Sequence, residues 1–302
     1  MKAVRMHQYG GPEVLSYDDD VPDPVVGPDT VLIGTIATSV NPIDWKVRSG
    51  ARQKDFPLTL PAILGRDVSG VVLAVGDQVR TFKPGDHVIA MADTTYAERV
   101  AVPEAQVAHL PDGVDPVDAA AIPLVVLTGD QLVRGATRVT AGQTIIVSGA
   151  LGSVGRAAVH TALKLGAKVI VGVRGRQVAE AESLGAHAVL ALDDDDAIAQ
   201  LDAVDGVADT VGGAVAAKLL GKVRPGGRFG YASVLPEGAA KDSVEISRVF
   251  AQPDAVTLRA FADDIADGSF VLPVSRRMPL SEAADAHALL EKGGGGKVVL
   301  TV

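Results

Sequence analysis

The chain has 302 residues and a formal net charge of −9; 47% of its residues are hydrophobic and none is cysteine. This length allows two domains, and the acidic balance gives no overall electrostatic support for binding nucleic acid or an anionic membrane. The absence of cysteine excludes disulfides, thiolate catalysis and cysteine-ligated zinc. No apolar run approaches transmembrane length and the N-terminal residues lack a signal peptide's apolar core, so we expect a soluble cytoplasmic protein.

The first part of the chain, up to about residue 120, is predicted to be rich in short β-strands. Asn41-Pro42 combines the residue types of a helix N-cap and a first helical position, which predicts a short helix over residues 43–48. Turns containing glycine, proline and aspartate separate the strands, as is typical of a compact barrel-like domain. Strands are expected at residues 3–6, 30–40 and 68–75.

After about residue 122 the pattern changes to helices that alternate with nearly continuous apolar strands, which indicates a parallel sheet. The run Asp193–Asp196 is interpreted as a solvated loop that caps the next helix, because adjacent carboxylates at a loop tip seldom converge on a metal. Strands are expected at residues 145–147, 169–173, 187–190, 204–209 and 228–232, with helices at 124–134, 177–184, 213–222 and 253–267.

The last part of the chain returns to a mixed pattern. It comprises residues 270–274, an expected helix at 281–292 and an expected closing strand at 297–302. Residues 293–296 form a run of glycines between that helix and that strand, and we assign them no function.

The most informative segment is Thr144–Gly155, TIIVSGALGSVG, in which a β-branched run leads into a glycine-rich turn. A helix over residues 156–165 follows, with apolar residues at helical spacing. In the dinucleotide fingerprint G-x-G-x-x-G, the three positions are Ala150, Gly152 and Gly155. Gly152 would let the backbone approach a pyrophosphate, which would then lie at the helix N-terminus.

The segment after the next predicted strand, residues 167–173, is where such a fold reads the adenosine ribose. An NAD-binding protein usually has an acidic residue there, whereas this chain has Arg174-Gly175-Arg176. Guanidinium groups can pair with the 2′-phosphate of NADP by charge-assisted hydrogen bonds, so NADP(H) is the predicted cofactor. The alternative is a glycine hairpin followed by a solvated basic turn.

Short motifs occur along the whole chain: YGGPEVL at 9–15, VNPIDWK at 40–46, GRDVSGVV at 65–72, FKPGD at 82–86, YAE at 96–98, SGALGSVG at 148–155, LGA at 184–186, DTVGG at 209–213 and GKVVL at 296–300. Together they resemble the medium-chain dehydrogenase/reductase superfamily, in its zinc-independent quinone oxidoreductase (zeta-crystallin-like) and alkenal/enone oxidoreductase branch. The resemblance extends over essentially the whole chain.

The resemblance implies an α/β fold in which a GroES-like β-barrel domain, built from both chain ends, accompanies a Rossmann domain with a doubly wound parallel sheet. We expect the barrel domain at residues 1–122 and 267–302 and the NADP(H)-binding domain at residues 123–266. The sheet edges of the Rossmann domain usually pair in this family, so a homodimer is expected.

The resemblance also indicates which chemistry to expect. Zinc-dependent alcohol dehydrogenases of the superfamily have Cys where Asn41 stands and His where Arg66 stands, so no metal site is expected. Without that Lewis acid, the expected reaction is NADPH-dependent hydride transfer to the C=C of an α,β-unsaturated carbonyl, or reduction of a quinone. Alternatives are an enoyl-thioester reductase and a non-catalytic NADPH-binding protein, although the acidic charge counts against an RNA-binding role.

Site residues follow from the resemblance position by position. Asn41 would lie near nicotinamide and substrate, and Lys46 would donate a hydrogen bond to a substrate carbonyl, unless it is a solvated lysine. Asp44 is interpreted as a structural or orienting residue rather than a general acid, because an unperturbed carboxyl is ionised at neutral pH. Tyr96 could border the site, but a position on the barrel surface is the favoured interpretation. The expected cofactor-binding residues are Asn41, Thr128, Ser148, Gly149, Ala150, Gly152, Ser153, Val154, Arg174, Arg176, Tyr231, Ser233, Gly296 and Lys297.

Overall fold

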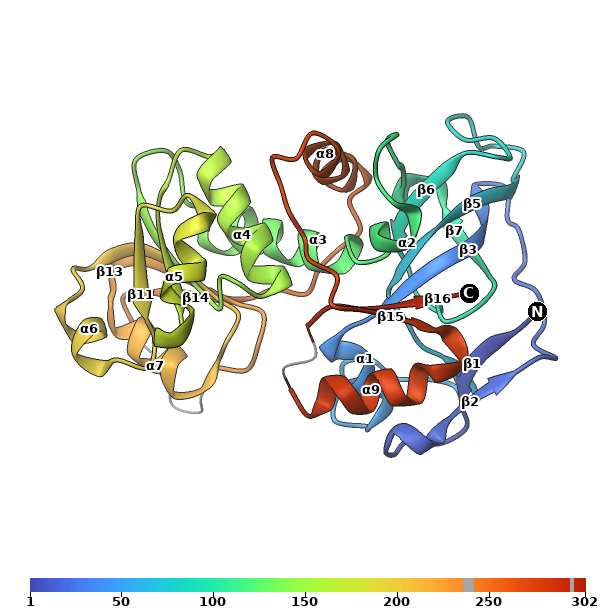
Figure 1. Ribbon diagram of the computed structural model, residues 1–302, viewed down its shortest axis with the longest axis horizontal. Coiled ribbons are helices and arrows are strands. Elements are labelled where there is room, and N and C mark those ends of the chain that lie inside the picture. Colours follow the sequence, from blue (N-terminus) through green and yellow to red (C-terminus); the bar gives the residue numbers. More distant parts are fainter. Residues whose placement is uncertain (236–241, 294–295) are drawn as a thin grey trace. The chain divides into compact units, whose positions relative to one another are not determined.

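The computed structural model describes residues 1–235, 242–293 and 296–302 (Figure 1). The chain divides into two compact units: unit 1 comprises Met1–Leu124 and Pro253–Val302, and unit 2 comprises Val125–Gln252. The glycine run predicted as a turn at residues 293–296 lies partly outside the described residues. Within the described part of the chain, no helix has the length and apolar character needed to cross a membrane.

Unit 1 is built on a largely antiparallel sheet around the long strand β3. One edge of β3 pairs with β5, and the register shifts between Thr35 and Ala37, an irregularity that bends the strand. The other edge pairs first with β7 and then with β16, so the sheet curves around a common core to which both chain ends contribute. The strands are β3 (Thr30–Val40), β5 (Asp67–Val75), β6 (His87–Met91), β7 (Arg99–Pro103), β8 (Val107–His109), β15 (Arg276–Pro279) and β16 (Val298–Thr301).

A smaller sheet and several helices complete unit 1. The side chains of β3 alternate between buried and half-buried over its first half, with Val31 and Ile33 fully buried, as expected of a strand with one face on the core. The smaller sheet has the order β2 (Leu15–Asp18), β1 (Ala3–Met6), β4 (Ala62–Ile63), and the helices are α1 (Pro42–Arg48), α2 (Pro116–Ala119), α8 (Ala255–Ala266) and α9 (Ala283–Glu291).

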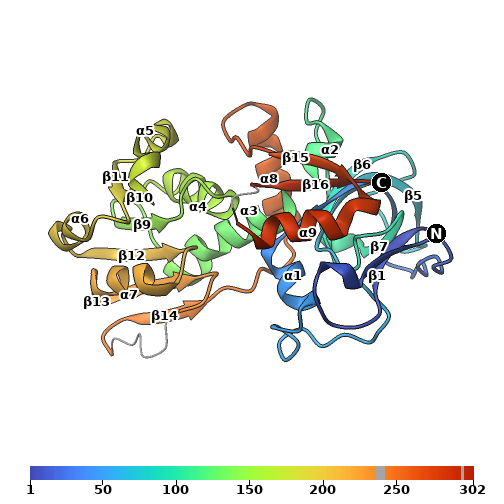
Figure 2. The ribbon, with the colours of Figure 1, turned by 60° about the horizontal axis from the view of Figure 1, so that its bottom comes forward.

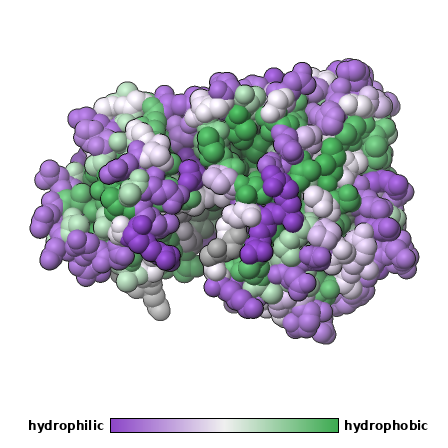
Figure 3. Space-filling view, viewed as in Figure 1, coloured by the Kyte–Doolittle hydropathy of each residue, from purple (hydrophilic) through white to green (hydrophobic). Residues whose placement is uncertain are grey.

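Helix α8 belongs to unit 1, whereas the sequence-based boundaries assign it to the middle domain. Its apolar residues Leu258, Phe261 and Ala262 are buried, and the Phe261 ring packs edge-on against Phe270 with centroids 5.1 Å apart. The helical spacing of these residues predicts a buried face but does not identify the unit that covers it. Figure 3 shows apolar side chains exposed around α8, where the exposed fraction of Val256 is 81%.

Residues 270–274 form no strand, and β15 begins later, at Arg276. Leu272 and Val274 still pack against the apolar cluster around Ala37 and Val299, which accounts for their alternating pattern. Pro273 stands between them and has no N–H to donate to a sheet ladder.

Among its described residues, unit 2 forms a six-stranded parallel sheet with the order β11-β10-β9-β12-β13-β14. Because β9 comes first in the chain, the order reverses between β9 and β12, which is the arrangement of a doubly wound Rossmann sheet. The strands are β9 (Thr144–Ser148), β10 (Lys168–Val173), β11 (Ala188–Ala191), β12 (Val204–Asp209), β13 (Val223–Tyr231) and β14 (Glu245–Arg248). The helices are α3 (Pro123–Gln131), a following π-helical turn (Leu132–Thr137), α4 (Ser153–Lys164), α5 (Val178–Ala181), α6 (Asp195–Gln200) and α7 (Gly213–Gly221) (Figure 2).

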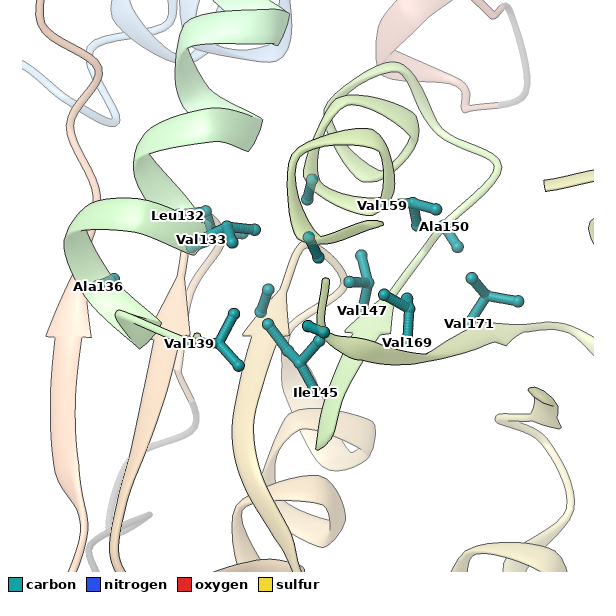
Figure 4. Packing of buried hydrophobic residues seen from close by; sticks show 14 of the residues in the cluster. Leu132, Val133, Ala136, Val139, Ile145, Val147, Ala150, Val159, Val169 and Val171 are labelled. Atoms are coloured by element: carbon teal, nitrogen blue, oxygen red, sulfur yellow. The ribbon is translucent and has the colours of Figure 1, made fainter. Parts of the chain in front are cut away.

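Successive residues of β9 pack against opposite faces of this sheet. Ile145 and Val147 join the apolar cluster that contains α4, α5 and the π-helical turn, and Figure 4 shows them facing Leu132, Val133 and Val159. Ile146 joins the cluster on the other face, with α6 and α7. Helices therefore cover both faces, which explains why the strands are almost continuously apolar. The fold is α/β, with a GroES-like barrel and a Rossmann domain.

Candidate functional site

The glycine turn, residues 149–152, lies at the carboxyl end of β9, next to the point where the strand order of unit 2 reverses. Open α/β sheets bind their ligands outside the carboxyl ends of the strands at this point. Gly149 has a φ of +65°, a backbone conformation that favours glycine, and the N–H of Gly152 donates to the carbonyl of Gly149 at 2.9 Å. This tight turn directs the chain from the sheet into α4.

The two glycines that flank the start of α4 have different surroundings. A Cβ at Gly155 would lie 2.2 Å from the carbonyl oxygen of Gly149, so only glycine lets α4 pack this close to the turn. A Cβ at Gly152 would meet only that same oxygen, at 3.2 Å, and Gly152 has an ordinary φ of −71°. Gly152 is therefore not required by packing, and the helix that it precedes has no side-chain cap for its first N–H groups.

A buried carboxylate, Asp209, fixes the loops that surround the glycine turn. Its Oδ1 accepts a hydrogen bond from Ser148 Oγ at 2.6 Å, and its Oδ2 accepts from Ser233 Oγ at 3.0 Å and from Gly212 N–H at 2.9 Å. Thr210 Oγ1 donates to the Ser148 carbonyl at 2.7 Å. The ends of β9, β12 and β13 are thus held together at one edge of the sheet. Nothing in the local sequence around Asp209 predicts this role.

The two arginines of the predicted 2′-phosphate site follow β10, at the same edge as the glycine turn because β9 and β10 are parallel neighbours. Arg174 and Arg176 are both exposed, and neither guanidinium forms a hydrogen bond or ion pair with another described residue. Between them, Gly175 N–H donates to Asp193 Oδ1 at 2.7 Å. Asp194 caps α6 by accepting from Ala197 N–H, which confirms the capping role predicted for the acidic run.

Two further predicted cofactor residues of unit 2 lie near this edge. Tyr231 ends β13, is half-buried and pairs in register with Asp209. Thr128 lies on α3 directly before Gly129, where an added Cβ would fall 2.6 Å from the carbonyl oxygen of Val154. This close approach places the Thr128 backbone beside the first turn of α4.

In unit 1, the predicted residues Asn41 and Lys297 meet in a fully buried polar cluster around Asp67. Lys297 Nζ donates to Asn41 Oδ1 at 2.7 Å and lies 3.4 Å from Asp67 Oδ2, and Asn41 Nδ2 donates to Asp67 Oδ2 at 2.7 Å. Ser39 Oγ also donates to Asp67 Oδ2, and Leu124 N–H donates to Asp67 Oδ1 at 2.6 Å. We call Ser39, Asn41, Asp67 and Lys297 the Asp67 cluster.

A chain of hydrogen bonds leads from this cluster along α1. Asp44 Oδ2 accepts from Asn41 N–H at 2.7 Å and from Tyr96 Oη at 3.1 Å. Tyr96 Oη lies 3.0 Å from His287 Nε2, and His287 Nδ1 lies 3.1 Å from Arg48 Nη1. We call Arg48, His287, Tyr96 and Asp44 the Asp44 chain. Tyr96 is fully buried, so its interpretation as a surface residue of the barrel is wrong: its hydroxyl finds partners inside.

Burial changes the protonation of these groups. Burial, with the charge of Asp67 acting in the same direction, raises the pKa of Asp44 to about 7, although the Asn41 N–H opposes this. The sequence-based assumption of an unperturbed carboxyl is therefore wrong. Burial and the Arg48 guanidinium lower the pKa of His287 to about 3, so this histidine is neutral. Burial also lowers the pKa of Lys297, against the effect of Asp67.

Lys46 and Asp44 are two positions apart on α1, about 200° around the helix axis. The Lys46 ammonium lies 5.5 Å from the centroid of the half-buried Trp45 ring.

Gly296 is exposed with a φ of +64°, and Arg66 donates to Asp93 at 2.5 Å. Among the described residues, no three His, Asp or Glu side chains are grouped as a metal site.

The sequence matches two family models, the alcohol dehydrogenase GroES-like domain over residues 27–112 and the zinc-binding dehydrogenase family over residues 184–300. The quinone oxidoreductase of Pseudomonas aeruginosa is 34% identical to it over 96% of this chain and 95% of its own length. The chain belongs to the medium-chain dehydrogenase/reductase superfamily, in its quinone oxidoreductase branch.

Other members of this superfamily support the same placement. The chloroplastic NADPH-dependent alkenal/one oxidoreductase of Arabidopsis thaliana is 31% identical over 99% of this chain and 79% of its own. Human quinone oxidoreductase is 37% identical over 193 residues, an alignment that spans only 58% of that relative and 63% of this chain. The Escherichia coli quinone oxidoreductase complexed with NADPH has a TM-score of 0.85 at 26% identity, and an NAD-dependent alcohol dehydrogenase has 0.88 at 30%, each covering both chains fully.

Proposed function

We propose that this chain is an NADPH-dependent oxidoreductase that transfers hydride to a quinone or to the C=C of an α,β-unsaturated carbonyl, without zinc. The observation that carries the proposal is the glycine turn at the strand-order reversal, which presents the uncapped N-terminus of α4. Membership of a branch whose relatives are named quinone oxidoreductase and NADPH-dependent alkenal/one oxidoreductase supports the reaction type.

The residues at this edge fit a dinucleotide. The pyrophosphate would lie on Ser148, Gly149, Ala150, Gly152, Ser153 and Val154, with the first N–H groups of α4 as donors. At Gly152 the space that a side chain would occupy is nearly free of other protein atoms. Phosphate oxygens could therefore approach the backbone there. Tyr231, Ser233 and Thr128 would flank the remainder of the cofactor, because they lie beside the same turn.

Arg174 and Arg176 would hold the adenosine 2′-phosphate. Both side chains are exposed at the end of β10, and their charges are not neutralised by another described residue. Guanidinium groups in this position bind a phosphate dianion more strongly than the neutral 2′-hydroxyl of NAD. NADPH is therefore the proposed cofactor, rather than NADH.

A reduced nicotinamide supplies a hydride, and conjugation in a quinone or enone spreads the resulting negative charge onto oxygen. For unit 1 we propose that Asn41, Gly296 and Lys297 take part in binding cofactor or substrate, as the resemblance to the family implies. The buried ammonium of Lys297 polarises the Asn41 amide to which it donates, and this favours negative charge nearby. Lys46 remains a proposed donor to the substrate carbonyl.

The experiment is to measure NADPH and NADH oxidation side by side with an ortho-quinone and a short 2-alkenal. We expect turnover with NADPH, and replacement of Arg174 and Arg176 by alanine to weaken NADPH binding by roughly 10- to 100-fold while leaving NADH binding nearly unchanged. The control variant is Arg224→Ala, an arginine of the same unit that pairs with Asp205. Equal NADPH and NADH affinities in the unmodified protein would contradict the 2′-phosphate assignment.

NADPH binding without oxidation of either substrate would contradict the proposed reaction. It would instead favour a thioester substrate or a non-catalytic NADPH-binding role. Stoichiometric zinc with chelator-sensitive turnover would contradict the zinc-independent chemistry.

We further propose a cytoplasmic homodimer. Among the described strands, β11 and β14 are the two edges of the unit 2 sheet, and the outer backbone groups of an edge strand can pair with a second copy. Light scattering should give twice the 30.9 kDa mass of the chain. A monomer mass at micromolar concentration would contradict this assembly.

A further inference from the structure

The Asp44 chain runs in one direction, and this direction can be assigned from its first member. The guanidinium of Arg48 has only donors, so His287 Nδ1 accepts from it at 3.1 Å. The neutral imidazole then carries its proton on Nε2 and donates to Tyr96 Oη at 3.0 Å. The Tyr96 hydroxyl in turn donates to Asp44 Oδ2 at 3.1 Å. Every donor in the chain therefore points toward Asp44.

Arg48 is itself held from two sides. Its Nε donates to the carbonyl of Gly10 at 3.2 Å, and its Nη2 pairs with the carboxylate of Glu291 on α9. The Arg48 side chain is 1% exposed and that of Glu291 is 28% exposed. The Asp44 chain of hydrogen bonds therefore begins at a fixed group, Arg48. It ends at Asp44, where one carboxylate oxygen accepts two hydrogen bonds.

Asp44 is surrounded by groups that respond to its charge. Asp67 on β5, with the same charge, favours the protonated form of Asp44, whereas Lys297 before β16 favours the ionised form. Tyr96 before β7 and the Asn41 N–H also favour the ionised form by donating to it. His287 on α9 is neutral, and Arg48 on α1 balances Glu291. Ionisation of Asp44 in turn favours the charged form of Lys297.

We propose that Asp44 is a positioning residue for the reduction: its ionised carboxylate, oriented by Tyr96, fixes the backbone of Asn41 and thereby the Asn41 amide against Lys297. The proposal rests on the proposed function for the reaction that is positioned. Uptake of a proton by Asp44 removes the charge-assisted bond from Asn41 N–H and weakens the hold on Lys297.

An asparagine would supply the same accepting oxygen without a charge, so a purely structural cap needs no carboxylate here. Burying an ionisable carboxyl lowers stability, and the loss grows as pH rises through the raised pKa. A charge that is kept at this cost in stability indicates a role beyond folding.

The test compares Asp44→Asn with the unmodified protein in two measurements. At pH 8 we expect a higher Tm for the variant, because it no longer buries a charge, together with a loss of kcat of about 10-fold or more. In the unmodified protein kcat should rise as pH increases through about 7, where Asp44 ionises. In Asp44→Asn this rising limb of the kcat–pH profile should be absent. A lower Tm at pH 8 with an unchanged pH profile would overturn the proposal and leave Asp44 a structural cap.

Tyr96→Phe supplies a second, independent variant. Its aromatic ring still fills the core, but it removes a donor that lowers the pKa of Asp44. The limb in kcat should therefore move to higher pH, by roughly one pH unit for a hydrogen bond to a charged group. A limb that stays in place, or moves to lower pH, would overturn the assignment to Asp44.

Asp205→Asn is the matched control. Asp205 also accepts from a backbone N–H, that of Thr144 at 2.7 Å. Although burial alone would raise it, the pKa of Asp205 is lowered by the Thr144 N–H and by Arg224. This variant should therefore have a lower Tm at pH 8, the opposite of Asp44→Asn, with an unchanged kcat profile.

A measurement that needs no substrate separates this proposal from the proposed function. In 15N-labelled protein the side-chain amide signal of Asn41 should move with pH around 7 in the unmodified chain and stay constant in Asp44→Asn. If no quinone or enone is reduced, the proposed function fails, and a moving amide signal still supports positioning by Asp44. A constant signal in the unmodified protein overturns the positioning role even where NADPH is oxidised.

Discussion

The two units build their candidate sites from different materials. In unit 2 the site is mainly backbone: a glycine turn, the first N–H groups of α4, and loops fixed by one carboxylate, Asp209. In unit 1 it consists of side chains that come from β3, β5, α1, α9 and the start of β16 and meet in the core. Backbone sites of the first kind tolerate changes in side chains, whereas each polar group of the second kind depends on its neighbours.

This difference has an energetic consequence. A buried hydrogen-bonded network is stable only while every member has its partner, because an unpaired buried charge loses its solvation without compensation. A glycine turn is limited instead by space, at the few positions where a Cβ would overlap with backbone. Mutations should therefore affect folding strongly in the Asp67 cluster, and should separate folding from binding in the glycine turn.

The largest effect is expected for Asp67→Ala. This change removes the acceptor of Ser39, Asn41 and Leu124 and leaves the buried ammonium of Lys297 without its counter-ion. Breaking one side of a buried ion pair costs roughly 3–5 kcal/mol, which urea denaturation would measure. Asp118→Ala is the control: its half-exposed pair with Arg277 should contribute about 1 kcal/mol or less. A loss of similar size in both variants would refute the distinction between the two kinds of site.

The pH dependence of stability should show two members of the Asp44 chain, Asp44 and His287, acting in opposite directions. The pKa of Asp44 is raised from 3.8 to about 7. Its contribution to the free energy of unfolding is therefore fully present below pH 3.8 and is lost as pH rises through 7. The pKa of His287 is lowered from 6.5 to about 3, so its contribution is full above pH 6.5 and is lost as pH falls through 3. Between pH 4 and 6 the two slopes oppose each other, each at roughly 1.4 kcal/mol per pH unit.

Single substitutions should therefore reveal pH dependences of the free energy of unfolding that cancel in the unmodified protein. In Asp44→Asn only His287 remains, and stability should fall as pH decreases from 6 to 4; in His287→Gln only Asp44 remains, and stability should fall as pH increases. Denaturation midpoints measured at intervals across this range would show it. Parallel slopes in the two variants would contradict the protonation states assigned to the chain.

The third prediction concerns the close packing of α4 on the glycine turn. In Gly155→Ala the new methyl group would lie 2.2 Å from the Gly149 carbonyl oxygen, so the turn or the helix must move. Overpacking of this kind typically costs roughly 1–3 kcal/mol, which thermal unfolding would detect. Gly221→Ala makes the same chemical change where a Cβ meets nothing within 4 Å, and should be neutral or slightly stabilising. Equal effects would show that the observed overlap is relieved without cost.

The backbone site could be predicted from the sequence because its signals are local. The glycines, the strand before them and the helix after them are contiguous, and the parallel sheet follows from the alternation of helices and strands. Arg174 and Arg176 follow the next strand, and parallel neighbours end at the same edge. The family resemblance added the barrel built from both chain ends, which the pairing of β16 with β3 confirms.

The side-chain site could be predicted only in part, because its members are far apart in the chain. The resemblance pointed to Asn41 and Lys297 separately, but not to their direct contact, nor to Asp67 and His287 as partners. The surface interpretation of Tyr96 failed because residue type does not reveal which face of the barrel a side chain occupies. The pKa of Asp44 depends on burial and on Asp67, neither of which local spacing contains.

The smallest change in stability, with a clear change in binding, is expected for Gly152→Ala. The φ of −71° suits alanine, and among the described residues beyond its chain neighbours the added methyl would meet only the Gly149 oxygen, at 3.2 Å. The unfolding free energy should therefore change by less than about 1 kcal/mol. The methyl would nevertheless stand where the pyrophosphate has to approach the first N–H groups of α4. The Kd for NADPH, measured by calorimetry, should rise by roughly 10-fold or more, equivalent to about 1.4 kcal/mol. An unchanged Kd would mean that the dinucleotide does not lie on this turn, and the backbone site of unit 2 would lose its assigned ligand.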